Sequence, residues 1–299
     1  MSKLLAPLLL LSLICAPAIA RERAWIEESR VIYPKKTEHF VLGEVSFDKK
    51  QVAVGVGLHY KHADHPDVGI DLFIYPAGAM PEAYAVKTGF DDMKDSIKLA
   101  EQYGRYENVH FGEEHDVDLP QPEAVPDEES GLAFVPVPHH GRSLAFDYTS
   151  DSVRFQSRAL LFYRYDYWIK LRASTDAFED EKLDAVVADA LPELIRDVRV
   201  RSRGACKPPS QKFGISGSQE PLPADVDPVS LDGERILMYV KEPQEETAKK
   251  MLTAIARRLE NGCVANFRVE LAKPQKDEAY TTIKFPKDAW TAQKPPSEG

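Results

Sequence analysis

Alternating apolar and polar positions dominate the first part of the chain. Between residues 38 and 76, the stretches HFVLGEVSF, QVAVGVGLHYKH and DVGIDLFIYP alternate apolar with polar or small residues, and a polar turn containing Pro66 separates the last two. A period of two is typical of a strand with one buried face. The pattern therefore predicts three strands, of which the last two form a hairpin.

A helix is expected next, because Pro76, Gly78 and Pro81 interrupt the strand pattern. Beyond them, apolar residues recur three or four positions apart in an otherwise charged segment, which predicts an amphipathic helix. This stripe consists of Val86, Phe90, Met93, Ile97 and Ala100. Gly104 is a suitable residue for the end of the helix.

The same order repeats further on. SLAFDYTSDSVRFQSRALLFYRYDYWIKLRAST predicts three strands with a turn at residues 150–152. A second helix is expected from Asp176 onward, and Pro192 should kink or interrupt it. Its apolar face consists of Leu183, Val186, Val187, Ala190, Leu194 and Val198. Strands joined by short turns favour an antiparallel sheet flanked by helices, an α+β fold with the order three strands, helix, three strands, helix.

The remaining segments differ in composition. Residues 112–141 carry eight acidic residues and five prolines but no Lys or Arg, which predicts a long acidic excursion in which GLAFVPV can form a short edge strand. The main domain is therefore expected over residues 26–200 and a linker rich in Pro, Gly and Ser over 201–230. A small strand-helix-strand-strand unit, with its helix at 243–262, is expected over 231–288, followed by a disordered tail at 289–299.

In the order of its elements the chain resembles the PsbP-like family of exported α/β proteins. The hairpin VGVGLHYKHADHPDVGIDLFIYP, followed by a helix, carries this likeness, which covers residues 38–198. The resemblance implies an antiparallel sheet between helices and an accessory or binding role, and it implies no enzymatic activity. The acidic excursion and the C-terminal unit fall outside it.

The first 20 residues have the pattern of an export signal. Lys3 precedes an apolar run that ends at Ile14, and Ala18-Ile19-Ala20 is a small-residue cleavage site. The run is too short for a membrane-spanning helix, which needs about 20 residues. Lipidation of Cys15 is the alternative to cleavage after Ala20. We therefore expect a periplasmic or secreted protein that does not insert into a membrane.

Removal of the signal leaves two cysteines, Cys206 and Cys263. In an oxidising compartment this pair predicts one structural disulfide, with a redox pair or a reactive thiol as the alternative. The formal net charge of −10 excludes a typical nucleic-acid-binding protein, because phosphate contacts need clustered Lys and Arg. An anionic lipid surface is disfavoured for the same reason.

The most concentrated candidate chemistry is the stretch HYKHADHPDV at residues 59–68. Zn²⁺ or Cu²⁺ needs three or four converging ligands, and imidazole suits both ions. The candidate ligands are His59, His62, Asp64, His65 and Asp67. The alternative is a solvated hairpin tip whose imidazoles point into solvent, and the H-x-x-H-x-x-H spacing matches no standard metal signature. No other cofactor is predicted.

Two further groups are candidate binding surfaces. An acidic loop can attract a basic partner protein, and its candidate residues are Glu113, Glu114, Asp116 and Asp118. They do not follow the spacing of a Ca²⁺ loop. The strand pair at 153–175 intersperses Arg and Lys with Tyr and Trp, which permits a sugar- or peptide-binding face, although alternating strands produce a charged face in any case.

The chain contains no recognisable catalytic motif. GISGS at 214–218 departs from the nucleophile elbow at its last position, and zinc-protease, phosphate-loop and dinucleotide motifs are absent. The leading hypothesis is therefore an exported, non-enzymatic protein that binds or assists another component of the cell envelope. The alternative is a metal-binding protein that uses His59, His62 and His65.

Overall fold

The computed structural model describes residues 26–78, 80–120, 139–203 and 274–286, together with the backbone of short strands at 126–127, 132–136, 229–231, 234–240 and 263–264. Its centre is a seven-stranded antiparallel sheet with the order β2-β3-β4-β10-β9-β8-β5. The strands are β2 (Phe40–Phe47), β3 (Val56–His62), β4 (Gly69–Pro76), β5 (Glu107–Asp118), β8 (His140–Ser150), β9 (Val153–Arg164) and β10 (Tyr167–Thr175).

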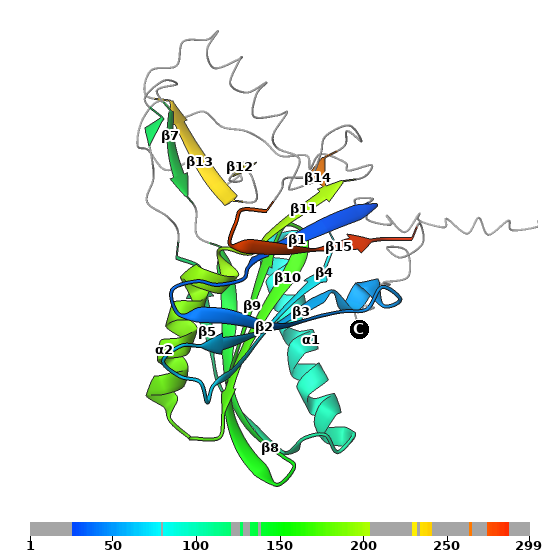
Figure 1. The fold of residues 1–299 in the computed structure, drawn as a ribbon, viewed down its shortest axis with the longest axis vertical. Helices are drawn as coiled ribbons and strands as arrows, with labels where there is room; N and C mark the ends of the chain where they lie inside the picture. Colours follow the sequence, from blue (N-terminus) through cyan, green and yellow to red (C-terminus); the bar gives the residue numbers. More distant parts are fainter. Residues whose placement is uncertain are drawn as a thin grey trace, which may run out of the picture.

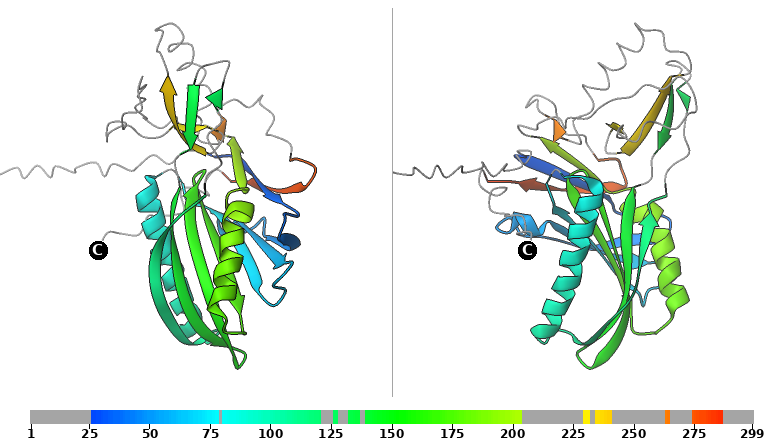
Figure 2. Two further views of the ribbon diagram at one scale, coloured as in Figure 1. Left: turned by 90° about the vertical axis from the view of Figure 1, so that its left-hand side faces the viewer. Right: turned by 180° about the vertical axis from the view of Figure 1, so that it is seen from behind.

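Two helices lie on opposite faces of this sheet, α1 (Glu82–Gln102) and α2 (Asp180–Ala190). Figure 1 shows the arrangement, and the right-hand view of Figure 2 shows the sheet between the cyan and yellow-green helices. We call the two sides the α1 face and the α2 face. The predicted α+β fold is confirmed. Neither of these described helices combines the length and the apolar character that crossing a membrane requires.

The stripe predicted for α1 is buried from Val86 to Ile97, and the helix ends just before Gly104, whose φ of 68° suits glycine. On the other side of the sheet, α2 buries Leu183, Val186 and Ala190. The predicted interruption at Pro192 is also confirmed, because a π-helical turn, η2 (Leu191–Ile195), replaces the α-helix there. Burial of each large apolar side chain contributes roughly 1.5–3 kcal/mol.

Strand β5 corrects one prediction. Residues 112–118, expected in an irregular excursion, belong to this 12-residue strand, which pairs with β8 across two register shifts. Because β5 is the last strand of the sheet, most of its side chains are exposed. Its sequence therefore lacks the apolar alternation of a buried strand. GLAFVPV does contain a strand, β7 (Leu132–Pro136), in a separate sheet with β6 (Pro126–Asp127), β12 (Val229–Leu231) and β13 (Glu234–Val240).

The start of the second predicted strand is also corrected. Val52 and Val54 lie in a 3₁₀ turn, η1 (Val52–Val54), rather than in the strand, and Val54 is exposed. The chain enters β3 only after Gly55, whose φ is 76° and where a Cβ would collide with the Ile74 carbonyl oxygen. Glycine at this close approach separates the turn from the strand.

A four-stranded sheet packs beside the main sheet, in the order β14-β11-β1-β15. Its strands are β1 (Glu28–Pro34), which was not predicted, β11 (Arg199–Arg203), β14 (Cys263–Val264) and β15 (Glu278–Lys284). Val31, Val200 and Ile283 from this sheet share one apolar core with the α2 face of the main sheet.

The C-terminal strands therefore pair with strands from earlier in the chain: β15 pairs with β1, and β13 pairs with β7. The helix predicted at 243–262, the tail and Cys206 lie outside the described residues. Cys263 begins β14, whose backbone pairs with Ser202 of β11. The disulfide and the domain boundaries stay predictions.

A buried polar network closes the hairpin between β9 and β10. Tyr165 and Asp166 form its tight turn with φ of 57° and 64°, and Asp166 Oδ1 lies 2.9 Å from the Tyr163 hydroxyl. That hydroxyl also contacts the Gly78 carbonyl at 2.8 Å and accepts the Met80 N–H. The single hydroxyl proton therefore faces two acceptors, the Gly78 carbonyl and the Asp166 carboxylate. Burial accordingly raises the pKa of Asp166 to about 6.

Asp166→Asn should stabilise the protein at neutral pH. The pKa of Asp166 rises from 3.8 to about 6 on folding, so its contribution to stability is full below pH 4 and declines as the pH rises to 6. Over this pH range the contribution of Asp166 to the free energy of unfolding falls by roughly 3 kcal/mol. The Asn side-chain oxygen keeps an acceptor for the Tyr163 hydroxyl without this loss. Chemical denaturation between pH 4 and 8 should give a stability gain that grows with pH; a gain independent of pH would contradict the assignment.

Candidate functional site

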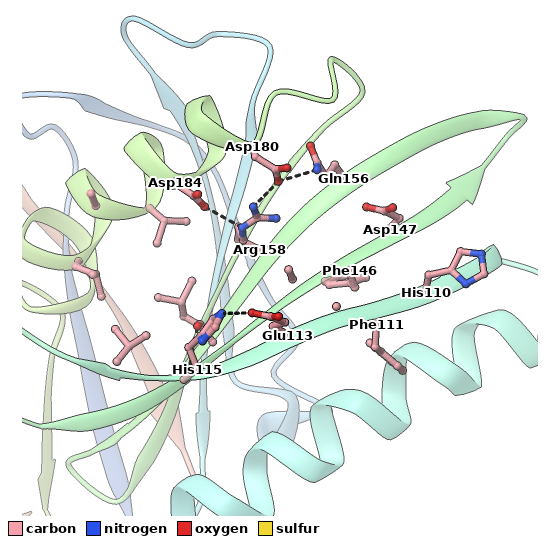
Figure 3. A pocket seen from close by; sticks show the side chains of 18 residues that line it. His110, Phe111, Glu113, His115, Phe146, Asp147, Gln156, Arg158, Asp180 and Asp184 are labelled. Carbon is pink, nitrogen blue, oxygen red and sulfur yellow. Dashed lines mark hydrogen bonds and ion pairs between the residues drawn. The ribbon is translucent and has the colours of Figure 1, made fainter.

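A groove opens on the α2 face because α2 packs against β9 and β10, while the sheet continues through β8 to β5. Figure 3 shows this space of about 630 Å³ between the helix and the three outer strands. Pockets that hold small ligands typically measure about 300–1,000 Å³. The groove is therefore large enough for a ligand.

The floor of the groove is largely apolar. Strand alternation points Ala145 of β8 and Leu160 of β9 toward α2, and the helix presents Val187 and Ala188 to them. Val117 of β5 and Leu191 of η2 complete this floor. Apolar surface in an open groove is a source of binding free energy, because a ligand that covers it removes that surface from water.

One end of the groove is polar. Arg158 projects from β9, donates to Asp184 at 2.9 Å, and also contacts Asp180. Gln156 donates to the same Asp180 oxygen at 2.7 Å (Figure 3). The Arg158 side chain is only 16% exposed. The two carboxylates hold its guanidinium group in place and offset its positive charge.

The outer wall is β5, and it divides the predicted acidic surface between two faces. Glu113 lines the groove and lies 3.5 Å from His115 (Figure 3). Glu114 instead contacts Lys94 of α1 at 2.7 Å and Arg142 at 2.8 Å. The other two residues form separate pairs, Asp116 with Arg142 and Asp118 with His140. Of the four predicted partner-binding residues, the groove therefore gathers only Glu113.

Charge around the groove is unbalanced. Four carboxylate residues line it, whereas Arg158 is the single Lys or Arg in the lining, and Arg154 beside the groove pairs with one of the four, Asp147. The carboxylates are Glu113, Asp147, Asp180 and Asp184. Such a lining attracts cations and disfavours anionic ligands. The share of α2 in this site was not predicted, because Asp180 has the ordinary pattern of a helix N-terminal turn and Asp184, one turn later, looks like any polar residue of an exposed helix face.

The histidine hairpin does not have the expected exposure. His59 lies on the α1 face and bonds Asp71 at 2.9 Å, whereas His62 is buried on the α2 face at 2% exposure. The prediction that all imidazoles point into solvent is wrong for His62, because β3 continues to this residue and keeps it on the face of Leu58 and Tyr60. Alternation thus places His59 and His62 on opposite sides of the sheet.

Both ring nitrogens of His62 are already bonded. Nδ1 accepts the backbone N–H groups of Asp64 and His65 at 3.1 and 3.2 Å, and Nε2 lies 3.2 Å from Asp189. These contacts select the neutral tautomer with its proton on Nε2. Of the remaining predicted ligands, His65 lies beside His62 with the two rings tilted by 32°, and Asp67 binds Lys182, which lowers the pKa of Asp67. The five predicted ligands do not converge on one point.

A histidine that sequence analysis missed lies beside this cluster. His39 stacks on the other side of His62 with ring centroids 5.6 Å apart, and its Nδ1 lies 2.5 Å from Glu193 Oε1. The other Glu193 oxygen accepts from the Thr37 hydroxyl and the His39 backbone N–H. Glu193 raises the pKa of His39. No local motif marks this pair, because its members are 154 positions apart.

Within the described part of the chain, one group of three His, Cys, Asp or Glu residues can supply ligand atoms to a single metal ion. It consists of Glu38, His39 and Glu193, whose candidate atoms all lie within 4.8 Å of one another. None of the ligands predicted from the hairpin belongs to it.

Comparisons with known proteins add a likeness in fold. No family model matches the chain, and no curated protein matches it. Among solved structures, it is similar to cyanobacterial PsbP (CyanoP) from Synechocystis sp. PCC 6803, at 11% sequence identity and a TM-score of 0.31. The match covers 59% of this chain and 94% of that chain. The resemblance to PsbP predicted from the order of elements is thus confirmed as a weak likeness of fold.

Replacing His62 should destabilise the protein far more than replacing His59. His62→Ala leaves a cavity and removes the acceptor of two backbone N–H groups, which should cost about 2–4 kcal/mol of unfolding free energy. His59→Ala is the matched control, since that side chain is 42% exposed, and its cost should stay below about 1 kcal/mol. Urea denaturation measures both; equal losses would show that the buried hydrogen bonds of His62 are unimportant.

Proposed function

We propose that this protein is an exported, non-catalytic binding protein of the cell envelope. We propose further that the groove beside α2 binds an extended segment of a partner protein in which apolar side chains are flanked by Lys or Arg. The observation that carries the proposal is the combination of an apolar floor with four carboxylates around a single Arg.

The floor and the rim select different parts of such a ligand. An apolar side chain of the partner would cover Leu160, Val187 and Leu191, while Lys or Arg beside it would approach Glu113 and Asp184. Charges of this kind mainly speed association and select the partner, and the apolar contact supplies most of the affinity. An acidic peptide would meet like charge along the rim.

A bulky residue in the groove should block binding. The probe is a labelled peptide, Lys-Leu-Arg-Leu-Lys, measured by fluorescence anisotropy at low salt. Ala188→Trp fills the space that Ala188 leaves on α2 and should weaken binding at least about tenfold, or ~1.4 kcal/mol. Ala185→Trp is the matched control, because Ala185 is also an exposed residue of α2 but does not line the groove.

Charge should matter in the same experiment. Glu113→Gln should weaken binding at low salt, whereas Glu114→Gln, on the opposite face of β5, should not. Equal binding of the peptide Glu-Leu-Glu-Leu-Glu, or equal effects of the two Trp variants, would overturn the proposal. Export is tested separately by the mass of the envelope-fraction protein, which should begin at Arg21.

A second candidate function, binding of a transition-metal ion, is supported at a site other than the predicted hairpin. Glu38, His39 and Glu193 offer one imidazole and two carboxylates, a donor set that suits Zn²⁺ with water as the fourth ligand. Since Glu193 Oε2 is engaged with Thr37, Oε1 and His39 Nδ1 would be the protein's principal donors.

Zinc should stabilise the folded protein if this second function is correct. At 100 times its Kd, Zn²⁺ would add about 2.7 kcal/mol, measured as a rise in melting temperature of protein without an affinity tag. His39→Ala should abolish the rise and His59→Ala should leave it unchanged. Retention of the rise in His39→Ala would remove this site, and loss of it in His59→Ala would restore the hairpin as the site.

A further inference from the structure

We propose that Asp147 and Phe178 form a subsite for an arginine side chain of the partner segment, and that Arg154 occupies this subsite in the free protein. The inference rests on the proposed function, because Asp147 lines the groove near its polar end (Figure 3). It narrows the flanking Lys or Arg of that segment to arginine at one position.

Arg154 shows how a guanidinium group fits this place. Its guanidinium carbon lies 4.5 Å from the centroid of the Phe178 ring, and its Nη2 donates to Asp147 Oδ2 at 2.9 Å. Asp147 is the direct partner of Gln156 in the pairing of β8 with β9, so the contact adjoins the polar end of the groove. A planar guanidinium can stack on a ring and donate to a carboxylate at the same time, which a lysine ammonium does less well.

The backbone holds the Phe178 ring at the surface in an uncommon conformation. Phe178 lies in the link between β10 and α2, its φ is 53°, and 40% of it is exposed. Residues other than glycine seldom adopt the left-handed region, and a bulky one there costs backbone energy. Burial of the ring in the core does not explain this conformation, because the ring stays exposed. A ligand that stacks on the ring does.

Arg154 can leave this position at little cost. Its side chain is 61% exposed, and exposed ion pairs contribute little to stability. Arg158 is different, because two aspartates of α2 hold it and its side chain is only 16% exposed. An arginine of the partner segment would therefore replace Arg154 and leave Arg158 in place. The exchange keeps a guanidinium group beside Asp147 throughout, so that carboxylate never loses its partner.

The subsite itself is tested on the full mature chain with Arg154→Gln, which removes the resident guanidinium group. The probes are N-acetyl-arginine amide and N-acetyl-lysine amide, titrated by ¹⁵N-edited NMR. The arginine probe should cause saturable shifts of the Asp147 and Phe178 amides and bind at least about threefold more tightly than the lysine probe. Phe178→Asn in the same background should abolish this preference, and it should fold because Asn tolerates a positive φ.

Two labelled peptides then connect the subsite to the groove. Arg-Leu-Arg-Leu-Arg and Lys-Leu-Lys-Leu-Lys carry the same charge, so fluorescence anisotropy compares guanidinium with ammonium groups directly. Arg154→Gln should strengthen binding of the arginine peptide at least about threefold and binding of the lysine peptide less. Arg196→Gln is the matched control, because it removes the same charge from an arginine that pairs with Asp197 and does not line the groove.

Equal gains in Arg154→Gln and Arg196→Gln, or an arginine probe that causes no saturable shift at Asp147 and Phe178, would overturn the subsite. The two proposals fail separately. If the single-residue probe binds beside Phe178 but neither peptide binds the wild-type protein, the groove proposal is wrong and the arginine site stands. If both peptides bind but no variant distinguishes arginine from lysine, the groove stands and the subsite is wrong.

Discussion

The main sheet is wider than either helix can cover, and the candidate sites follow from this mismatch. Seven strands about 4.8 Å apart span roughly 29 Å, whereas a helix with its side chains is about 10 Å wide. Each helix therefore covers only part of its face. On the α2 face the second sheet adds cover over the inner strands through Val31, Val200 and Ile283, and the strands left open are β8 and β5. On the α1 face, the open strands are at the β3 and β4 side.

The two faces of the sheet carry different charged groups. The groove on the α2 face gathers carboxylates from β5, β8 and α2 around one Arg that is already paired. Lys170 and Arg172 of β10 lie on the α1 face instead, over the rings of Phe73 and Tyr148. Strand alternation produces this separation, because consecutive residues of one strand point to opposite faces.

Helices and strands that bury one face could be predicted from the sequence, because their apolar residues recur with a regular period. Elements that bury little could not. Helix α1 and strands β4, β8, β9 and β10 each carry a clear apolar period, and each was predicted close to its bounds. β5 was not predicted, because an edge strand buries few side chains and its Glu113 to Asp118 segment has the composition of a loop. β1 was not predicted, because its partners, β11 and β15, lie far away in the sequence.

The same limit applies to the sites. The hairpin histidines were recognisable as a cluster, but their directions depend on where β3 ends. A strand that ended two residues earlier would have left His62 in the turn. The pairing of His39 with Glu193 and the clamp of Arg158 by α2 join residues that the sequence separates. Such contacts arise only once the helices have packed on the sheet, and no local spacing encodes them.

The edge strand β5 favours one mode of recognition over another. A long, regular edge would invite a partner strand to pair with its backbone, and proteins prevent this with charged side chains and bulges. β5 has both, since five of its 12 residues are acidic and its pairing with β8 shifts register twice. Backbone pairing by a partner is thereby disfavoured. Recognition through side chains in the adjoining groove is not disfavoured. Glu113, whose charge discourages strand pairing at this edge, also lines the groove with the apolar floor. The acidic residues of β5 therefore disfavour pairing of a partner strand at the edge, and in the proposed function one of them, Glu113, would also contact a basic segment in the groove.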